Sequence, residues 1–102
     1  MAARAKFNIG QIVHHARFDY RGVIVDVDPQ FSGSEEWYDS VAKSRPPKDQ
    51  PWYRVLVDGA EYETYVAERH LERDPSCNPV SHPAVDEYFA SYRDGHYLMQ
   101  TH

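Results

Sequence analysis

The sequence predicts one small domain that consists mainly of β-strands. Several short segments alternate apolar and polar residues, an Asp-Gly pair separates two of these segments, and prolines end two of the longer runs. A chain of 102 residues has the usual length of a single domain with one hydrophobic core. Residues 1–102 are therefore expected to fold as one unit.

The first two strands are predicted between residues 11 and 28. Residues 11–18 lie between Gly10 and Asp19, and their β-branched and apolar side chains favour a strand. Residues 20–28 alternate more clearly, until Pro29 ends the segment. One face of this second strand is expected to carry Val23, Val25 and Val27, and the other face Ile24, Asp26 and Asp28.

A short helix is predicted after the second strand. Ser32 and Glu35 have the spacing of a capping box, in which two side chains bond free backbone N–H groups at the start of a helix. Apolar residues then recur at helical spacing, as Trp37, Tyr38, Val41 and Ala42. The helix is expected to end before Pro46 and Pro47, because proline removes a backbone donor and constrains the preceding residue.

A β-hairpin is predicted on both sides of Asp58 and Gly59. An Asp-Gly pair suits a primed turn, in which both central residues have positive φ. The flanking strands are indicated by two alternating sets, Tyr53, Val55 and Val57 before the turn and Tyr62, Thr64 and Val66 after it.

A C-terminal helix is predicted over about residues 82–94. Ser81 is a suitable N-cap, Pro83 suits the first turn, and Gly95 is expected to end the helix. Its apolar stripe is expected to consist of Val85, Tyr88, Phe89 and Tyr92. Together, these elements predict a small SH3-like β-barrel over about residues 7–74, with a short inserted helix and the C-terminal helix packed on it or projecting from it.

Composition limits the classes of function. The single Cys77 rules out an intramolecular disulfide, and no segment has the length of a signal peptide core or a membrane span, so a cytoplasmic protein is expected. The net charge is −5 at pH 7. Six acids against two arginines lie between Asp58 and Asp74, and this balance disfavours phosphate binding on that face.

No catalytic or cofactor motif is found, and a protein that is not an enzyme and holds no cofactor or metal is expected. Asp26 and Asp28 share a predicted strand face and remain a weaker alternative as a cation or acid/base pair. The histidines are a second weak alternative, because His14 and His15 are adjacent on a strand and must point to opposite faces. The other four are His70, His82, His96 and His102.

The best candidate for a binding surface lies in residues 37–53. This segment combines aromatic side chains, which provide large contact areas, with cations around a proline-rich loop. The predicted partner-binding residues are Trp37, Tyr38, Lys43, Arg45, Lys48 and Trp52.

Four segments of the chain resemble the heat-shock protein HspQ family, also described as the hemimethylated-DNA-binding or YccV-like domain. The similar segments are KFNIGQIVHHARFDYRGVIVDVDPQFSGSEEW (6–37), PWYRVLVDG (51–59), ETYVAERHL (63–71) and HPAVDEYF (82–89). The resemblance implies an SH3-like β-barrel, a stress-response role in the bacterial cytoplasm, and preferential binding of hemimethylated DNA. It also implies control of proteolysis of the replication initiator, a link to the protease Lon, and a homo-oligomer such as a trimer.

The sequence therefore leaves two candidate classes of binding partner. A protease of the Lon type, or its substrates, comes first because the chain is acidic, and hemimethylated DNA is the alternative. A trimer would still gather three copies of Lys43, Arg45 and Lys48 into one basic patch.

Overall fold

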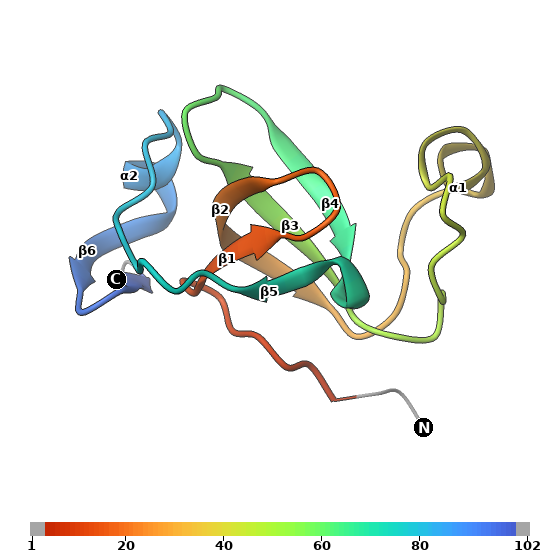
Figure 1. Ribbon diagram of the computed structural model, residues 1–102, viewed down its shortest axis with the longest axis horizontal. Helices are drawn as coiled ribbons and strands as arrows, with labels where there is room; N and C mark the ends of the chain where they lie inside the picture. The colour runs from red at the N-terminus through yellow and green to blue at the C-terminus, as the bar shows by residue number, and fades with distance from the viewer. Residues whose placement is uncertain (1–3, 100–102) are drawn as a thin grey trace.

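The fold is an antiparallel sheet with a helix at one end and a small hairpin at the other (Figure 1). The computed structural model describes residues 4–99. The elements are β1 (Ile12–His15), β2 (Tyr20–Asp28), α1 (Glu35–Val41), β3 (Trp52–Val57), β4 (Glu63–Ala67), the 3-10 turn η1 (Glu68–His70), β5 (Leu71–Arg73), α2 (Val85–Tyr88), β6 (Phe89–Arg93) and β7 (His96–Met99).

The main sheet has five strands in the order β4-β3-β2-β1-β5, and β6 pairs with β7 in a second sheet. The predicted mainly β class is confirmed. The sheets are not closed into a barrel, because β4 and β5 are the two edges of the main sheet and no pairing between them occurs in residues 4–99. The space beside β4 is instead a groove, which is described below.

A β-bulge in β2 changes which way its side chains point. The register with β3 shifts between Ile24 and Asp26. Val23 and Val25 pack on one face of the sheet, as predicted, and Ile24 packs on the other. Val27 was expected on the face of Val23 and Val25, but this prediction is wrong: beyond the bulge it packs with the cluster of Ile24.

The hairpin of β3 and β4 is confirmed, with Trp52 opposite Ala67 and Leu56 opposite Glu63. The predicted two-residue primed turn is wrong, because five residues connect the strands and only Gly59 has a positive φ, of 78°. Tertiary contacts account for the longer turn: the Gly59 N–H group donates to the Ser81 carbonyl oxygen.

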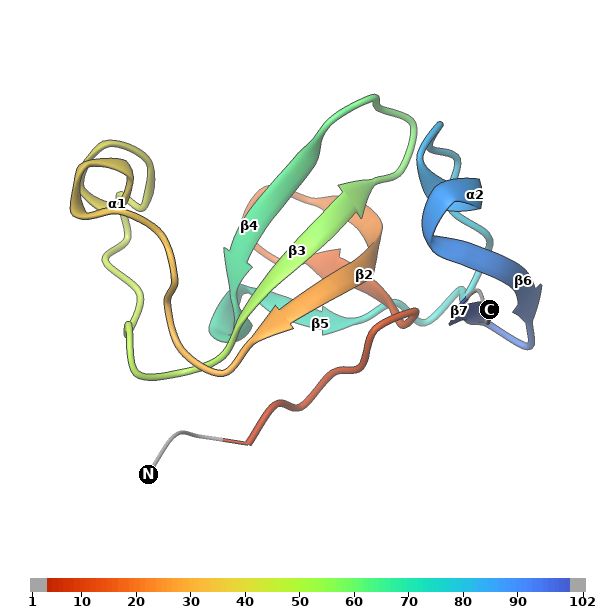
Figure 2. The same cartoon turned by 180° about the vertical axis from the view of Figure 1, so that it is seen from behind.

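Helix α1 forms where it was predicted, but its cap differs. The N-cap is Ser34, whose hydroxyl oxygen accepts a hydrogen bond from the Trp37 N–H group at 3.0 Å. The N–H group of Ser32, the predicted cap, instead donates to the Tyr65 hydroxyl oxygen. Figure 2 shows α1 at the end of the sheet opposite to α2 and β6.

The predicted C-terminal helix over 82–94 is wrong. Helix α2 has a single turn, and the chain then becomes extended at Phe89 and forms the β6-β7 hairpin. Asp94 and Gly95 connect its strands with φ values of 51° and 84°, which is the geometry that an Asp-Gly primed turn requires. Burial of Phe89 and Tyr97 against the main sheet stabilises this hairpin.

Within residues 4–99, three hydrophobic clusters form the core. Two cover the opposite faces of the sheet, and the third joins α1 to the sheet through aromatic side chains. The first cluster consists of Phe7, Val13, Ile24, Tyr53, Val55, Val66 and Leu71; the second of Ile12, Val23, Val25, Leu56, Val80, Phe89 and Tyr97; the third of Tyr38, Ala42, Trp52 and Ala67.

One arginine connects the sheet to the loops at its end. Arg21 donates from Nη1 to Asp58 at 2.9 Å, from Nε to Asp74 at 3.0 Å, and also to the Asn78 carbonyl oxygen. Asp74 is buried, and its pKa is lowered: burial opposes the charged form, but hydrogen bonds from Ser76 and Arg21 outweigh it.

We predict that Arg21→Met lowers the free energy of unfolding by about 2 to 4 kcal/mol, because it leaves a buried carboxylate without its cation. Urea denaturation at pH 7 measures this. Arg73→Met is the matched control, since Arg73 is exposed and has no side-chain partner within residues 4–99; it should change stability by less than about 0.5 kcal/mol. Equal losses in the two variants would contradict the prediction.

Candidate functional site

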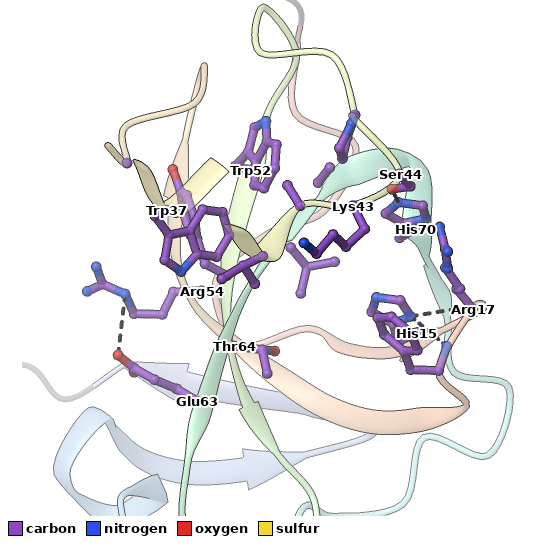
Figure 3. A pocket seen from close by; sticks show the side chains of 18 of the residues that line it. His15, Arg17, Trp37, Lys43, Ser44, Trp52, Arg54, Glu63, Thr64 and His70 are labelled. Atoms are coloured by element: carbon purple, nitrogen blue, oxygen red, sulfur yellow. Dashed lines mark hydrogen bonds and ion pairs between the residues drawn. The ribbon is translucent and has the colours of Figure 1, made fainter. Parts of the chain in front are cut away.

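A groove with a volume of about 890 Å³ lies beside β4. It runs between the α1 segment and the turn that connects β1 to β2, and its lining is mainly apolar. In Figure 3, Trp37 and Trp52 lie on one side of the groove, His15 and His70 lie on the other, and Lys43 lies between them. Grooves of this size and character are typical binding sites.

An aromatic cluster forms the wall beside α1. Trp52 is 1% exposed at the start of β3, and its ring centre lies 5.2 Å from that of Tyr65. The Trp37 ring meets Tyr65 edge-on at 5.7 Å. The Trp52 indole N–H donates to the Pro47 carbonyl oxygen at 3.1 Å, and the Tyr65 hydroxyl donates to Asp28. These contacts pack the rings against one another and fix the orientation of Trp52 and Tyr65 through their polar atoms.

A stack of rings forms the opposite wall. The His15 ring lies 4.8 Å from Phe18, 5.0 Å from Tyr20 and 5.5 Å from His70. Nδ1 of His15 accepts hydrogen bonds from the N–H groups of Arg17 and Phe18, so this nitrogen carries no proton. Burial lowers the pKa of His15 to about 4, and burial also lowers the pKa of His70.

The charges at the groove differ in whether they have partners. Arg54 lies 3.5 Å from Glu63 and 3.9 Å from Asp26. Arg17 and Lys43 form no ion pair with any residue in 4–99. The groove therefore offers an apolar lining with unpaired positive charge.

Only half of the predicted partner-binding residues line the groove. Trp37, Lys43 and Trp52 do. The other three form a separate stack, in which the cations of Arg45 and Lys48 lie 4.6 Å and 4.3 Å from the ring centre of the buried Tyr38. Arg45 pairs with Asp39 at 2.7 Å and Lys48 with Glu35 at 2.5 Å, so both cations hold the proline-rich loop onto α1.

Sequence reasoning missed the ring stack of His15, Phe18 and His70. Phe18 is 68% exposed although it is large and apolar. Adjacent positions such as His14 and His15 do point to opposite faces, but the sequence held no sign that His70, 55 positions later, would stack on one of them. The stack depends on the pairing of β5 with β1, which is a long-range contact.

In the described part of the chain, the residues of the two weaker alternatives, the aspartate pair and the histidines, form local contacts instead of a cluster of metal ligands. Within residues 4–99, no three His, Cys, Asp or Glu side chains gather as metal ligands would. His14 lies between Asp19 at 2.7 Å and Glu72 at 2.8 Å, one on each ring nitrogen, and these hydrogen bonds raise its pKa. Asp26 accepts from the Val27 N–H group. His102 lies outside the described residues.

Fold and groove together define a small, mainly β domain with a mainly apolar groove. A family model described as "Hemimethylated DNA-binding protein YccV like" matches residues 5–96. The chain therefore belongs to the YccV-like family. No helix in the described part of the chain is long and apolar enough to cross a membrane.

We predict that His15 makes the protein less stable in acid. The unfolded chain protonates His15 near pH 6.5, whereas the folded chain does so near pH 4. The contribution of neutral His15 to stability is therefore complete above pH 6.5 and is lost as the pH falls toward 4, by roughly 3 kcal/mol. His15→Asn retains an acceptor but cannot titrate, so the difference in unfolding free energy between wild type and variant should shrink over this interval in urea titrations.

His14→Asn is the matched control, with the opposite sign. The pKa of His14 is raised by hydrogen bonds to Asp19 and then Glu72, so its contribution is complete below pH 6.5 and is lost as the pH rises through the raised pKa. A His15→Asn difference that stays constant between pH 7 and pH 4 would show that burial does not hold His15 neutral.

Proposed function

We propose that this chain is a non-enzymatic stress-response regulator that binds an ATP-dependent protease of the Lon type, or the substrates of that protease, and promotes degradation, including that of the replication initiator. The observation that supports this proposal is the mainly apolar lining of the groove. Apolar and aromatic surface of this kind is typical of the centre of protein–protein contacts, whereas contacts to nucleic acid depend on cations that meet phosphates.

The arrangement of charge supports the same order of partners. Arg45 and Lys48, two of the three cations expected to meet a partner, are paired with acids of α1. Asp28, which no cation in residues 4–99 pairs with, also lies in the groove and would repel a phosphate backbone. The proposal includes a cytoplasmic location and a homo-oligomer such as a trimer.

We predict that Trp37→Ala abolishes the effect on proteolysis. Trp37 presents its ring to the groove, and removal of an aromatic anchor typically weakens a protein contact by about 30-fold or more. Purified protein is added to a Lon-type protease and a labelled substrate, and both pull-down and substrate turnover are measured at two salt concentrations.

Tyr62→Ala is the matched control, because Tyr62 is a 62% exposed aromatic residue outside the groove. It should leave turnover unchanged. Thermal unfolding establishes that Trp37→Ala is folded. If wild-type protein neither binds the protease or its substrate nor changes turnover, the proposed regulator role is wrong.

Hemimethylated-DNA binding is the second candidate, and the family description favours it. For DNA binding, the best candidates to contact phosphate groups are Arg17 and Lys43, because both line the groove and form no ion pair within the described part of the chain. A groove lined by aromatic rings also suits stacking on unpaired bases.

For this candidate we predict an affinity that falls steeply with salt and a preference for hemimethylated over fully methylated duplex. Lys43→Glu should weaken binding and reduce the slope of log affinity against log salt by about one. Arg45→Glu should weaken binding less, because Asp39 already neutralises Arg45. Fluorescence anisotropy at two salt concentrations measures both, and equal affinity for the two duplexes would exclude specific recognition.

A further inference from the structure

The outer edge of β4 carries unpaired backbone groups. In the ladder with β3, Val57 bonds to Tyr62 and Glu68 bonds to Pro51, so every second residue between them, Thr64 and Val66, also turns its backbone groups toward β3. The intervening residues turn theirs away from the sheet. These residues are Glu63, Tyr65 and Ala67. Within residues 4–99, no residue bonds the outward N–H groups of these three residues or the outward C=O groups of Glu63 and Tyr65, whereas the Ala67 C=O group caps the 3-10 turn η1 and accepts its first hydrogen bond.

The groove runs along this edge. All five residues of β4 line it, although successive side chains of a strand point to opposite faces. A groove that contacts both faces of an edge strand must pass beside the strand itself. The open edge from Glu63 to Ala67 is about 15 Å long, which matches five residues of extended chain.

The other edge of the sheet is protected, and the contrast is informative. Strand β5 has only three residues, of which Glu72 and Arg73 are charged and exposed, and Glu72 pairs with His14. Short, charged edges of this kind discourage pairing with another chain. Strand β4 is longer, lies against an apolar groove, and lacks this protection over Thr64, Tyr65 and Val66.

The charged residues at the groove indicate which kind of polypeptide segment would fit it. The unpaired cations Arg17 and Lys43 both line the groove. The hydroxyl of Ser44 lies 2.9 Å from Nε2 of His70, and His70 belongs to the 3-10 turn that directly follows β4. Lys43, the neighbour of Ser44 in the chain, therefore lies near the Ala67 end of β4. An acidic side chain at one end of an otherwise apolar segment would complement this charge.

We propose that the groove binds an extended apolar polypeptide segment with a terminal acidic residue, which adds a strand to the free edge of β4. The inference rests on the proposed function, because it states how the polypeptide partner is held. Backbone hydrogen bonds to Glu63, Tyr65 and Ala67 give affinity, and the walls around Trp37 and His15 accommodate the alternating side chains.

Amide hydrogen exchange tests the pairing in the whole chain. The probe is the blocked peptide Asp-Val-Thr-Val-Thr-Val-Asp at about 1 mM, which carries an acid at each end so that either strand direction can bind. Exchange at Glu63, Tyr65 and Ala67 should slow by at least about tenfold when peptide is added. Thr64 and Val66 are internal controls, because their N–H groups already bond to β3 and should not change.

Two N-methylated peptides separate backbone pairing from side-chain contact. One is methylated on its three valines and the other on its two threonines, so each removes the donors of one edge while it keeps every side chain. One of the two should lose binding and the other should keep it. If both bind as the parent peptide does, the segment does not pair with β4 and the inference is wrong.

Ala67→Pro gives an independent test in the protein. Ala67 has φ −70°, which the proline ring permits, and the change removes one outward N–H group. Peptide affinity should be about fivefold lower than in Ala67→Gly, which also removes the alanine side chain but keeps the backbone donor, as for one lost hydrogen bond. If Ala67→Pro does not fold, the exchange measurement on the native chain decides alone.

The outcomes distinguish this inference from the proposed function. Stimulated proteolysis without slower exchange at Glu63, Tyr65 and Ala67 would overturn strand addition and leave the regulator role intact. Protection of these amides that rises with protein concentration in the absence of peptide would also overturn it, because a second copy of the chain would then occupy the edge. Protection by the peptide, with unchanged Thr64 and Val66, supports it.

Discussion

The rest of the structure depends on the antiparallel ladder between β2 and β3, with its bulge between Ile24 and Asp26. Side chains of β3 enter all three hydrophobic clusters: Tyr53 and Val55 pack in the first, Leu56 in the second and Trp52 in the third. A central strand that is buried on both faces fixes the register of its neighbours, because a slip of one residue would exchange the two faces. The bulge then allows β2 to end in the polar positions that Tyr65 and Arg54 contact.

The groove follows from where β3 begins. Trp52 stands at its first position and anchors the aromatic wall, while the preceding loop is held by the Tyr38 hydroxyl, which donates to the Pro46 carbonyl oxygen. This fastens α1 at one end of the sheet, beside β4 but without covering its edge. A groove built on a packed strand and a packed aromatic cluster would need little reordering to bind the proposed partner, so little ordering entropy would oppose binding.

The sequence was most informative where local pattern and tertiary packing agree. Alternation located β2, β3 and β4, and helical spacing located α1.

Prediction from the sequence failed where contacts between distant residues decide the local structure. Asp58-Gly59 and Asp94-Gly95 are the same dipeptide, yet only the second forms the tight primed turn, because Ser81 and Arg21 hold the first in a longer loop. The apolar spacing of residues 85–92 resembles a helix, but burial of Phe89 against the sheet favours a strand. Half of the six predicted binding residues, Trp37, Lys43 and Trp52, line the groove; the wall of His15 and His70 arises from the long-range pairing of β1 with β5.

Net acidity is a weaker guide to the partner than it first appeared from composition. Five of the six acids between residues 58 and 74 have partners within the fold: Asp58, Glu63, Glu68, Glu72 and Asp74. Glu68, for example, accepts the Tyr53 hydroxyl at 2.5 Å in the interior. Two of the three cations of the predicted basic patch, Arg45 and Lys48, are paired with acids of α1. Arg21 and Arg54 offset the charge of Asp58, Asp74 and Glu63 only in part, the Tyr53 partner of Glu68 is neutral, and the net charge of the chain is unchanged. At the groove, Arg17 and Lys43 form no ion pair within residues 4–99 and lie beside the apolar lining. The proposal of a polypeptide partner rather than a phosphate backbone therefore rests on that lining and on the free edge of β4, and not on the total charge of the chain.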